Sequence, residues 1–283
     1  MSDTLPTESS KKPRPIAPLL KWPGGKRRLL HFILPLIPRK FDRYYEPFLG
    51  SGALFFALQP RQAFLSDKNA DLIYAYNQIR NNPGAVIKHI AGLRNTERDY
   101  YAVRADTPRS GAKRAARLIY LSTLSFNGIH RVNLRGEFNV PYGYKTHLRP
   151  CDPEKINAVS DLLGKATIGC EDFEVAVAKA QEGDLVYLDP PYTVAHGNNG
   201  FLKYNARIFS WDDQKRLADV AHKLAGRGCS VIVSNADHSS IRELYRDFDV
   251  LEIERHSVIA ASSNFRRPII ECVFYNRQNR NAQ

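Results

Sequence analysis

The early part of the chain contains a strand, a glycine turn, a helix and a second strand that ends in an acid. The first strand ends within residues 44–48, the turn is Gly50-Ser51-Gly52, and residues 53–58 form an apolar helix. The second strand covers residues 63–66 and ends at Asp67. This order predicts an α/β domain of the nucleotide-binding kind, in which parallel strands alternate with helices.

Further strands are expected late in the chain, and we predict them to be parallel as well. They cover residues 184–189, 230–234, 250–253 and 268–274, and the clearest helix between them covers residues 211–224. Each strand is a short apolar run of the length that a buried strand requires.

The spacing of these elements predicts an insertion. Gly50 and Asp189 are 139 residues apart, whereas a βαβ unit takes about 30 residues. Residues 71–150 supply the surplus and are typical of a helical subdomain with one β-hairpin. We therefore expect a flexible tail at 1–18, an α/β domain made of 19–70 and 151–276, the inserted subdomain 71–150, and a second tail at 277–283.

The charge of the chain indicates a polyanionic partner. The formal net charge is +12 and the isoelectric point is near 9.6, which favours nucleic acid over a membrane surface. Residues 112–150 carry seven Lys or Arg against one acid, Glu137, and so hold half of that excess. A solvated helix face usually alternates its charges, so this segment predicts a phosphate-binding surface.

Cysteine and histidine usage indicates neither a metal site nor a disulfide framework. Cys151, Cys170, Cys229 and Cys272 lie far apart and the histidines form no ligand-like cluster. A reducing cytoplasm is the expected compartment, with association to the nucleoid through DNA. Residues 1–18 lack the apolar region of a signal peptide, and no apolar run could span a bilayer. We expect no metal, no membrane association and no obligate protein partner.

The most informative short motif is Asp189-Pro190-Pro191-Tyr192, which follows the apolar run 185–188. Two prolines after an acid end a strand and prevent a helix from starting there. The motif presents a carboxylate, a carbonyl and a flat ring on a rigid turn, which suits a planar base held by its exocyclic amine. A plain strand-ending turn with a capping acid is the alternative.

The glycine turn fits an adenosine ligand that carries no phosphates. Phe55 occupies the position of the third glycine of a dinucleotide fingerprint, and the chain has no P-loop. Asp67 follows Gly50 by 17 residues, close to the ~20 expected for an acid that binds ribose hydroxyls. S-adenosylmethionine meets both conditions, although a simple tight turn with a helix-capping Asp67 meets them too.

These motifs together resemble the Dam family of DNA adenine N6-methyltransferases, the D12 class whose recognition domain is inserted before the DPPY motif. The resemblance runs in order from about Leu20 to Tyr275. It implies a Rossmann-like methyltransferase sheet with an inserted, mostly helical DNA-recognition subdomain. The matching segments are KWPGGK at 21–26, EPFLGSG at 46–52, LSD at 65–67, CEDF at 170–173, DPPY at 189–192, FSWDDQ at 209–214, SN at 234–235 and RRPIIE at 266–271.

The resemblance also implies roles for the residues of the catalytic domain. Asp189 and the Pro190 carbonyl would accept hydrogen bonds from the adenine amino group, with Pro191 completing the turn. Tyr192 would stack on a base that has been flipped out of the duplex. The enzyme would then act mainly through orientation and preorganised acceptors. The implied contacts to S-adenosylmethionine are Trp22, Lys26, Phe48, Gly50, Gly52, Asp67, Asp172, Phe173 and Asp189.

Residues 131–141 predict a β-hairpin that turns at Arg135-Gly136, and this hairpin resembles the recognition hairpin of the family. The resemblance implies that Arg131 reads a guanine, that Phe126 wedges into the duplex, and that the methylated site is GATC. Ile129 departs from the Leu that is usual in the best-known branch at a position facing thymine. The implied contacts to double-stranded DNA are Phe126, Asn127, Ile129, Arg131, Asn133, Arg135, Pro141 and Lys145.

Three alternatives remain open at this point. A catalytically inactive DNA-binding protein would have little reason to keep Trp22, Lys26, Asp67 and Asp189 together. Cytosine-N4 methyltransferases use the same chemistry but more often have Ser at the position of Asp189. A protein N-methyltransferase usually has Asn there and would not need the basic insertion.

Overall fold

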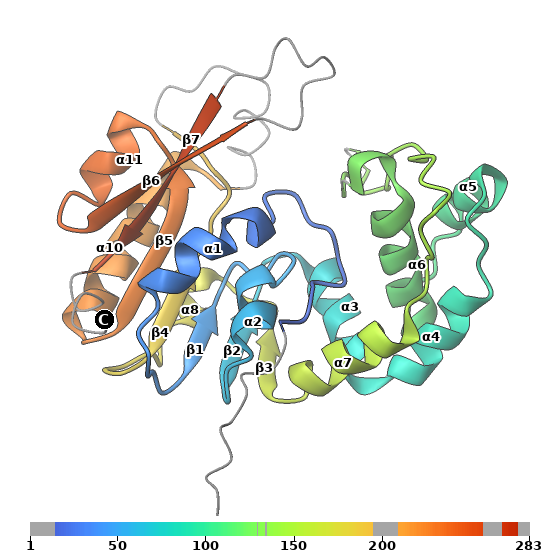
Figure 1. Cartoon of the computed structure of the whole chain (residues 1–283), viewed down its shortest axis with the longest axis horizontal. Coiled ribbons are helices and arrows are strands. Elements are labelled where there is room, and N and C mark those ends of the chain that lie inside the picture. Colours follow the sequence, from blue (N-terminus) through green and yellow to red (C-terminus); the bar gives the residue numbers. More distant parts are fainter. Residues whose placement is uncertain (1–14, 129, 134, 195–208, 257–267, 277–283) are drawn as a thin grey trace, which may run out of the picture.

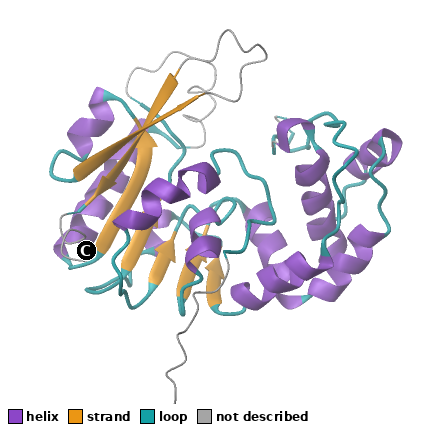
Figure 2. Cartoon of the chain, in the orientation of Figure 1, coloured by secondary structure: helices purple, strands orange, loops and turns teal. Residues whose placement is uncertain are grey.

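A computed structural model describes residues 15–128, 130–133, 135–194, 209–256 and 268–276. Its centre is a seven-stranded sheet with the order β3-β2-β1-β4-β5-β7-β6 (Figures 1 and 2). The strands are β1 (Tyr44–Glu46), β2 (Ala63–Ser66), β3 (Ala166–Gly169), β4 (Leu185–Leu188), β5 (Ser230–Ala236), β6 (Asp249–His256) and β7 (Pro268–Tyr275).

Helices and 3₁₀ turns surround this sheet. The first four in the chain are η1 (Lys26–Leu29), α1 (Leu30–Ile33), η2 (Leu34–Leu36) and α2 (Ala53–Leu58). The later ones are α7 (Pro153–Leu163), α8 (Phe173–Ala176), α10 (Trp211–Gly226) and α11 (Ser239–Leu244).

The sheet is buried on both faces, as parallel sheets with crossover helices require. Successive side chains of a strand point to opposite faces, so Tyr44 and Tyr45 belong to two different core clusters. The cluster of Tyr44 includes residues of α2, of α3 (Ala70–Asn81) and of α7, and the cluster of Tyr45 includes residues of α8, α10 and α11. Strand β4 is buried along its whole length, which explains why its sequence is uniformly apolar.

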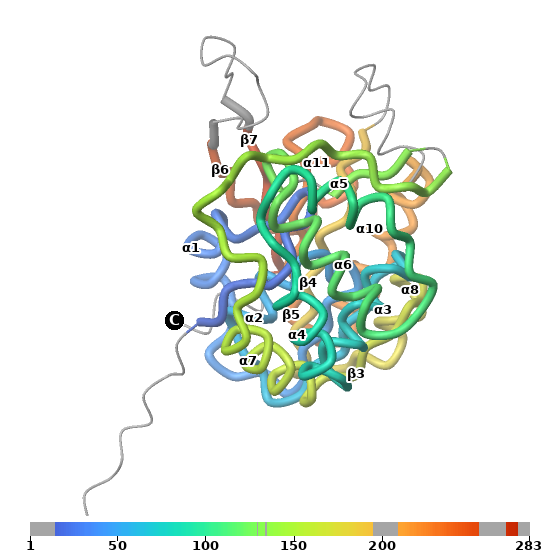
Figure 3. Tube along the Cα trace, turned by 90° about the vertical axis from the view of Figure 1, so that its right-hand side faces the viewer, coloured from blue at the N-terminus to red at the C-terminus, as the bar shows by residue number. Residues whose placement is uncertain are grey.

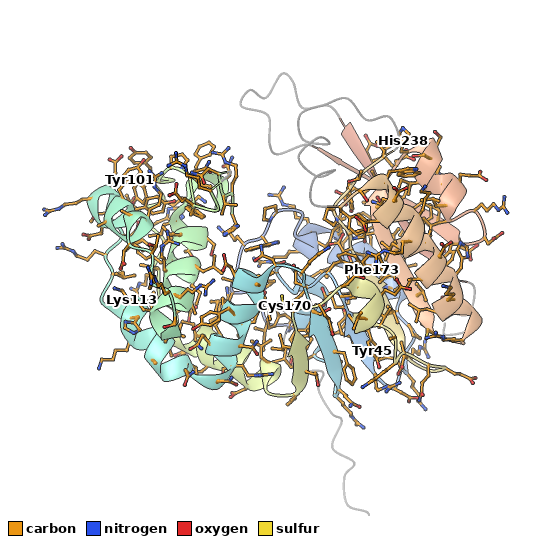
Figure 4. All side chains as sticks on the ribbon, turned by 180° about the vertical axis from the view of Figure 1, so that it is seen from behind. Tyr45, Tyr101, Lys113, Cys170, Phe173 and His238 are labelled. Atoms are coloured by element: carbon orange, nitrogen blue, oxygen red, sulfur yellow. The ribbon has the colours of Figure 1, made fainter. Side chains whose placement is uncertain are left out.

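A helical lobe lies beside the sheet and is formed by the chain between β2 and α7 (Figures 1 and 3). Its own core gathers Tyr100, Tyr120 and Tyr142 with residues of α6 and of the hairpin. In Figure 4, Tyr101 and Lys113 mark this lobe, whereas Phe173 and His238 mark the sheet domain. The helices are α3 (Ala70–Asn81), α4 (Pro83–Ala91), α5 (Glu97–Ala105), α6 (Gly111–Leu124) and the 3₁₀ turn η3 (Phe126–Gly128).

The α/β fold class and the mostly helical insertion are confirmed, but two details of the predicted sheet are wrong. Strand β7, predicted to be parallel, is antiparallel to both β5 and β6. Strand β3, at one edge of the sheet, was not predicted at all. Residues 26–36 form a 3₁₀ turn, one turn of α-helix and a second 3₁₀ turn. In the described part of the chain, no helix is both long and apolar enough to span a membrane.

Candidate active site

The site is built at the edge of the sheet where the parallel strands end. Strands β1, β2, β4 and β5 are parallel neighbours, so their carboxyl ends lie along one edge. Glu46 is the last residue of β1, Asp67 follows β2, Asp189 follows β4, and Asn235 lies near the end of β5. In open α/β sheets this edge is where ligands bind.

The glycine turn after β1 is held in place by the acid that follows β2. The Asp67 carboxylate accepts hydrogen bonds from the backbone N–H groups of Gly50 and Asn69, both at 2.9 Å. The Tyr76 hydroxyl donates to the Gly50 carbonyl at 3.0 Å. Gly50 and Gly52 have φ of +47° and +66°, a region that favours glycine. A side chain at Gly50 would also meet the indole of Trp22, because its Cβ would lie 3.3 Å from Cδ1.

Asp189 is joined to Lys26, which lies far from it in the sequence. The Lys26 ammonium is 2.7 Å from Asp189 Oδ1 and also donates to the Gly24 carbonyl at 2.8 Å. Lys26 is only 5% exposed, so this ion pair is shielded from solvent. Burial raises the pKa of Asp189 to about 6, and the nearby Lys26 cation limits that rise. The Lys26 ammonium also lies 4.8 Å from the centre of the Tyr192 ring.

Glu46 is a second buried carboxyl at the same edge. Tyr44 donates to its Oε2 at 2.9 Å, and the backbone N–H of Phe55, in the first turn of α2, also bonds to it. Burial raises the pKa of Glu46 to about 8, and the charges of Asp189 and Asp67 add to the rise. Glu46 is therefore largely protonated at neutral pH, which limits the negative charge beside Asp189.

The DPPY turn is fixed by side chains from three other elements. Gln214 of α10 donates to the Pro191 carbonyl at 3.2 Å and accepts from the Asn235 side chain at 3.0 Å. The Tyr192 hydroxyl donates to Glu271 of β7 at 3.0 Å. Glu271 reaches the site because β7 runs antiparallel and pairs it with Ala236 at the end of β5. Within the described residues, no hydrogen bond ends on the Pro190 carbonyl.

Gln214→Leu is expected to lower kcat and to destabilise the fold by about 1–3 kcal/mol. The variant removes both hydrogen bonds of a fully buried side chain and leaves the Pro191 carbonyl and the Asn235 amide without this partner. Chemical denaturation and single-turnover kinetics measure the two effects. Lys215→Leu, on the exposed side of the same helix, is the matched control. Equal behaviour of the two variants would show that Gln214 does not hold the turn.

Three phenylalanines form an aromatic cluster beside the glycine turn. The ring centres of Phe48 and Phe173 are 5.5 Å apart, and Phe209 lies 5.6 Å from Phe48 and 5.8 Å from Phe173. Arg216 of α10 covers the Phe173 ring at 4.3 Å and pairs with both oxygens of Asp172 at 2.9 Å. Asp172 also caps α8, so Arg216 and this cap fix the position of its carboxylate.

The hairpin of the helical lobe forms where the sequence predicts it. Asn139 donates its backbone N–H to the Arg131 carbonyl, and the Asn139 side chain accepts from Arg131 Nε at 2.8 Å. The Asn133 side chain accepts from the backbone N–H groups of Arg135 and Glu137, so it organises the turn. The turn closes at residue 136, which has φ of +78°. Arg131 and Arg135 are both exposed.

The other predicted DNA contacts lie at the base of this hairpin. The Phe126 backbone N–H donates to the Pro141 carbonyl at 2.9 Å, and the Phe126 side chain is 53% exposed. Asn127 is exposed and has a left-handed backbone, with φ of +54°. Lys145 donates to the Ser125 carbonyl at 3.2 Å. Ile129 lies outside the described residues.

The structure therefore brings the predicted residues together in three groups. Asp189, Pro190, Pro191 and Tyr192 lie with Lys26 at the end of β4. The second group is Trp22, Gly50, Gly52 and Asp67 at the glycine turn, and the third is Phe48, Phe173 and Asp172. Trp22 also contacts the base of the hairpin through His130, as described below. Sequence reasoning did not assign site roles to Glu46, Gln214, Arg216, Asn235 and Glu271, although four of them lie within the quoted motifs.

Comparison with known proteins agrees with this geometry. A sheet with these strand ends and this glycine turn has the fold of a methyltransferase that uses S-adenosylmethionine. Residues 22–259 match the family model of D12 class N6 adenine-specific DNA methyltransferases. The chain belongs to this family, so it is an enzyme that methylates adenine in DNA.

Relatives with assigned activities support the same family. The Type II methyltransferase M1.LlaDCHI of Lactococcus lactis is 38% identical over 93% of this chain and 96% of its own length. The Type II methyltransferase M.MjaIII of Methanocaldococcus jannaschii is 32% identical over 89% and 96%. The DNA adenine methylase of Vibrio cholerae is 32% identical over 89% and 93%.

Proposed function

We propose that this enzyme methylates N6 of an adenine that is flipped out of duplex DNA within the sequence GATC. The observation that carries the proposal is the position of Asp189. Its carboxylate lies in a shielded site at the end of β4, on the same edge as the glycine turn and Asp67. The membership of the family supports adenine as the base and double-stranded DNA as the substrate.

The residues at the glycine turn fit S-adenosylmethionine, which the family implies as the methyl donor. Gly50 and Gly52 allow the tight turn to form against the Trp22 and Phe56 rings, and Asp67, which holds this turn, stands at the position of an acid that binds ribose hydroxyls. The half-buried Phe48 ring, with Phe173 packed behind it, offers a flat apolar face for the adenine ring, and Asp172, held by Arg216, offers an acceptor for its amine. When it is bound, S-adenosylmethionine supplies an electrophilic methyl group attached to a sulfonium.

The protein groups act on the target adenine by holding its amine. Asp189 and the Pro190 carbonyl accept the two N–H bonds, which localises the lone pair of the amine on the nitrogen. Tyr192 stacks against the base, and its hydroxyl is anchored on Glu271. Gln214 holds the Pro191 carbonyl so that the acceptors keep their directions. Preorganised acceptors of this kind need no reorganisation during the reaction.

The basic hairpin supplies the recognition of DNA. Arg131 is exposed, and the bond of its Nε to Asn139 leaves the far side of its guanidinium able to bind a guanine edge. Phe126 is an exposed aromatic ring at the base of the same hairpin, suited to replace a flipped base in the stack. The exposed arginines of the segment outside this contact, Arg135 and Arg149, are placed to contact phosphates.

Transfer of a labelled methyl group from S-adenosylmethionine to short duplexes tests the proposal. The duplexes carry GATC or one of its single-base-pair variants, and the product nucleoside is identified by mass spectrometry. N6-methyladenine in the GATC duplex alone is the expected result. Equal labelling of all duplexes would overturn the site, and N4-methylcytosine would overturn the base.

The rate of transfer is expected to depend on pH through Asp189. Only the ionised Asp189 carboxylate accepts its bond from the adenine amine well, so kcat/KM is full above the pKa of about 6 and falls as the pH drops through it. Lys26→Gln removes the cation that lowers the pKa of Asp189, so the acidic limb of the pH–rate profile should move to higher pH. Lys26→Arg keeps the positive charge, so the limb should stay near its position in the natural chain. The pH profile of the three proteins measures this, and an unmoved or lower limb in Lys26→Gln would contradict it.

A further inference from the structure

Two aromatic rings join the glycine-turn region to the recognition hairpin. Trp22 stacks on His130, with ring centres 4.4 Å apart and an angle of 19° between the rings. His130 directly precedes Arg131, and its ring meets Phe138 of the opposite hairpin side edge-on at 5.5 Å. Burial lowers the pKa of His130 to about 4, so its ring is neutral at pH 7 and stacks as an uncharged aromatic.

A second contact holds the same two segments together. Gly128 has φ of +66°, and a Cβ at this position would overlap the Lys21 side chain. The backbone at Gly128 therefore lies directly against the Lys21 side chain. Lys21 and Trp22 on one side, and Gly128 and His130 on the other, form a docked pair of loops.

The Trp22 indole faces the cofactor region as well as the hairpin. A Cβ added to Gly50 would lie 3.3 Å from Cδ1 of the indole, so the indole packs against the glycine turn. The backbone N–H of Gly50 donates to the Asp67 carboxylate, which holds the turn in place. One half-buried ring thus borders both the glycine turn and the base of the hairpin. A ligand that fixes the indole on one side also fixes the surface against which His130 packs.

We propose that His130 is a positioning residue that couples cofactor binding to DNA binding. S-adenosylmethionine at the glycine turn orders Trp22, and Trp22 orders the hairpin through His130, so that each ligand raises the affinity for the other. The coupling is reciprocal by thermodynamic necessity, and a stacked aromatic pair corresponds to about 2- to 12-fold in affinity. This inference rests on the proposed function, which places the cofactor beside Gly50.

The test measures the coupling factor, which is the ratio of the Kd values for DNA without and with saturating S-adenosylhomocysteine. The DNA is a short duplex with one GATC site, and the Kd of the cofactor product with and without DNA gives the reciprocal ratio. The variants are His130→Ala, His130→Gln and His130→Phe, with His147→Ala as the matched control. His147 is an exposed histidine of the same inserted segment. Circular dichroism melts confirm that each variant is folded.

The coupling factor of the natural chain is expected to fall toward one in His130→Ala and His130→Gln. His130→Phe, which keeps a flat ring, and His147→Ala should retain it. In the Trp211→Phe variant, Trp22 is the single tryptophan. The fluorescence emission of Trp22 should change when DNA binds to this variant, but not when DNA binds to the same variant with His130→Ala added. Unchanged coupling in His130→Ala, or no coupling in the natural chain, would overturn the inference and leave the proposed function intact. Failure of the natural chain to bind either ligand would overturn both.

Discussion

Asp189→Ala is expected to lower the rate of methyl transfer by about 10²- to 10³-fold, the usual loss for one preorganised polar group in an active site. The variant removes the carboxylate that accepts from the adenine amine and leaves Lys26 without its ion-pair partner. Binding of duplex DNA should stay largely intact, because the basic hairpin lies on the helical lobe and not on the sheet. Single-turnover kinetics and DNA titrations separate these two quantities.

A graded series sharpens this prediction. Asp189→Asn keeps one carbonyl acceptor, so it should lose less activity than Asp189→Ala. Asp219→Ala is the matched control, because Asp219 is an exposed acid on α10. Unchanged turnover in Asp189→Ala would remove the carboxylate from the mechanism. An equal loss in Asp219→Ala would mean that the effect is not specific to the site.

Arg131→Ala is expected to relax discrimination at one guanine of the recognition site. A bidentate contact between Arg and guanine contributes about 1–3 kcal/mol, or roughly 5- to 150-fold, against the wrong base. Methylation of GATC should therefore fall, while methylation of sites that differ at this guanine should fall much less. The measurement compares kcat/KM on the GATC duplex with that on its variants at the first position.

The neighbouring arginine provides the contrast for this experiment. Arg135 lies at the tip of the same hairpin, where it is exposed and follows the turn set by Asn133. Arg135→Ala should weaken binding on all duplexes alike and reduce the dependence of the affinity on salt. If Arg131→Ala behaves in the same way, Arg131 contacts a phosphate and does not read a base.

The Asp189-Pro190-Pro191-Tyr192 turn could be predicted from sequence because its signal is local. Apolar residues 185–188 followed by Asp189, Pro190 and Pro191 determine both the strand and its end. The direction of β7 could not be read from its apolar pattern, since that pattern is the same for parallel and antiparallel strands. The predicted bounds 250–253 and 268–274 left 14 residues between the strands, enough for a crossover, whereas β6 and β7 as observed are separated only by residues 257–267, too few for a parallel connection.

The contacts that complete the site could not be predicted because they join distant parts of the chain. Lys26 meets Asp189, Tyr192 meets Glu271, and Trp22 meets His130 only after the sheet and the lobe have formed. Strand β3 escaped prediction because Ala166–Gly169 is a four-residue edge strand with little apolar content. Its position matters, since the CEDF segment with Asp172 follows it.

Mapping of N6-methyladenine in living cells measures the reaction, its sequence specificity and the need for Asp189 in one experiment. Plasmid DNA is taken from cells that lack adenine methylation and express either the natural chain or Asp189→Ala, and modified bases are located by long-read sequencing. We expect N6-methyladenine at GATC throughout the plasmid with the natural chain and almost none with Asp189→Ala. Absence of methyladenine with the natural chain, or its presence in equal amount with Asp189→Ala, would rule out adenine methylation that depends on Asp189.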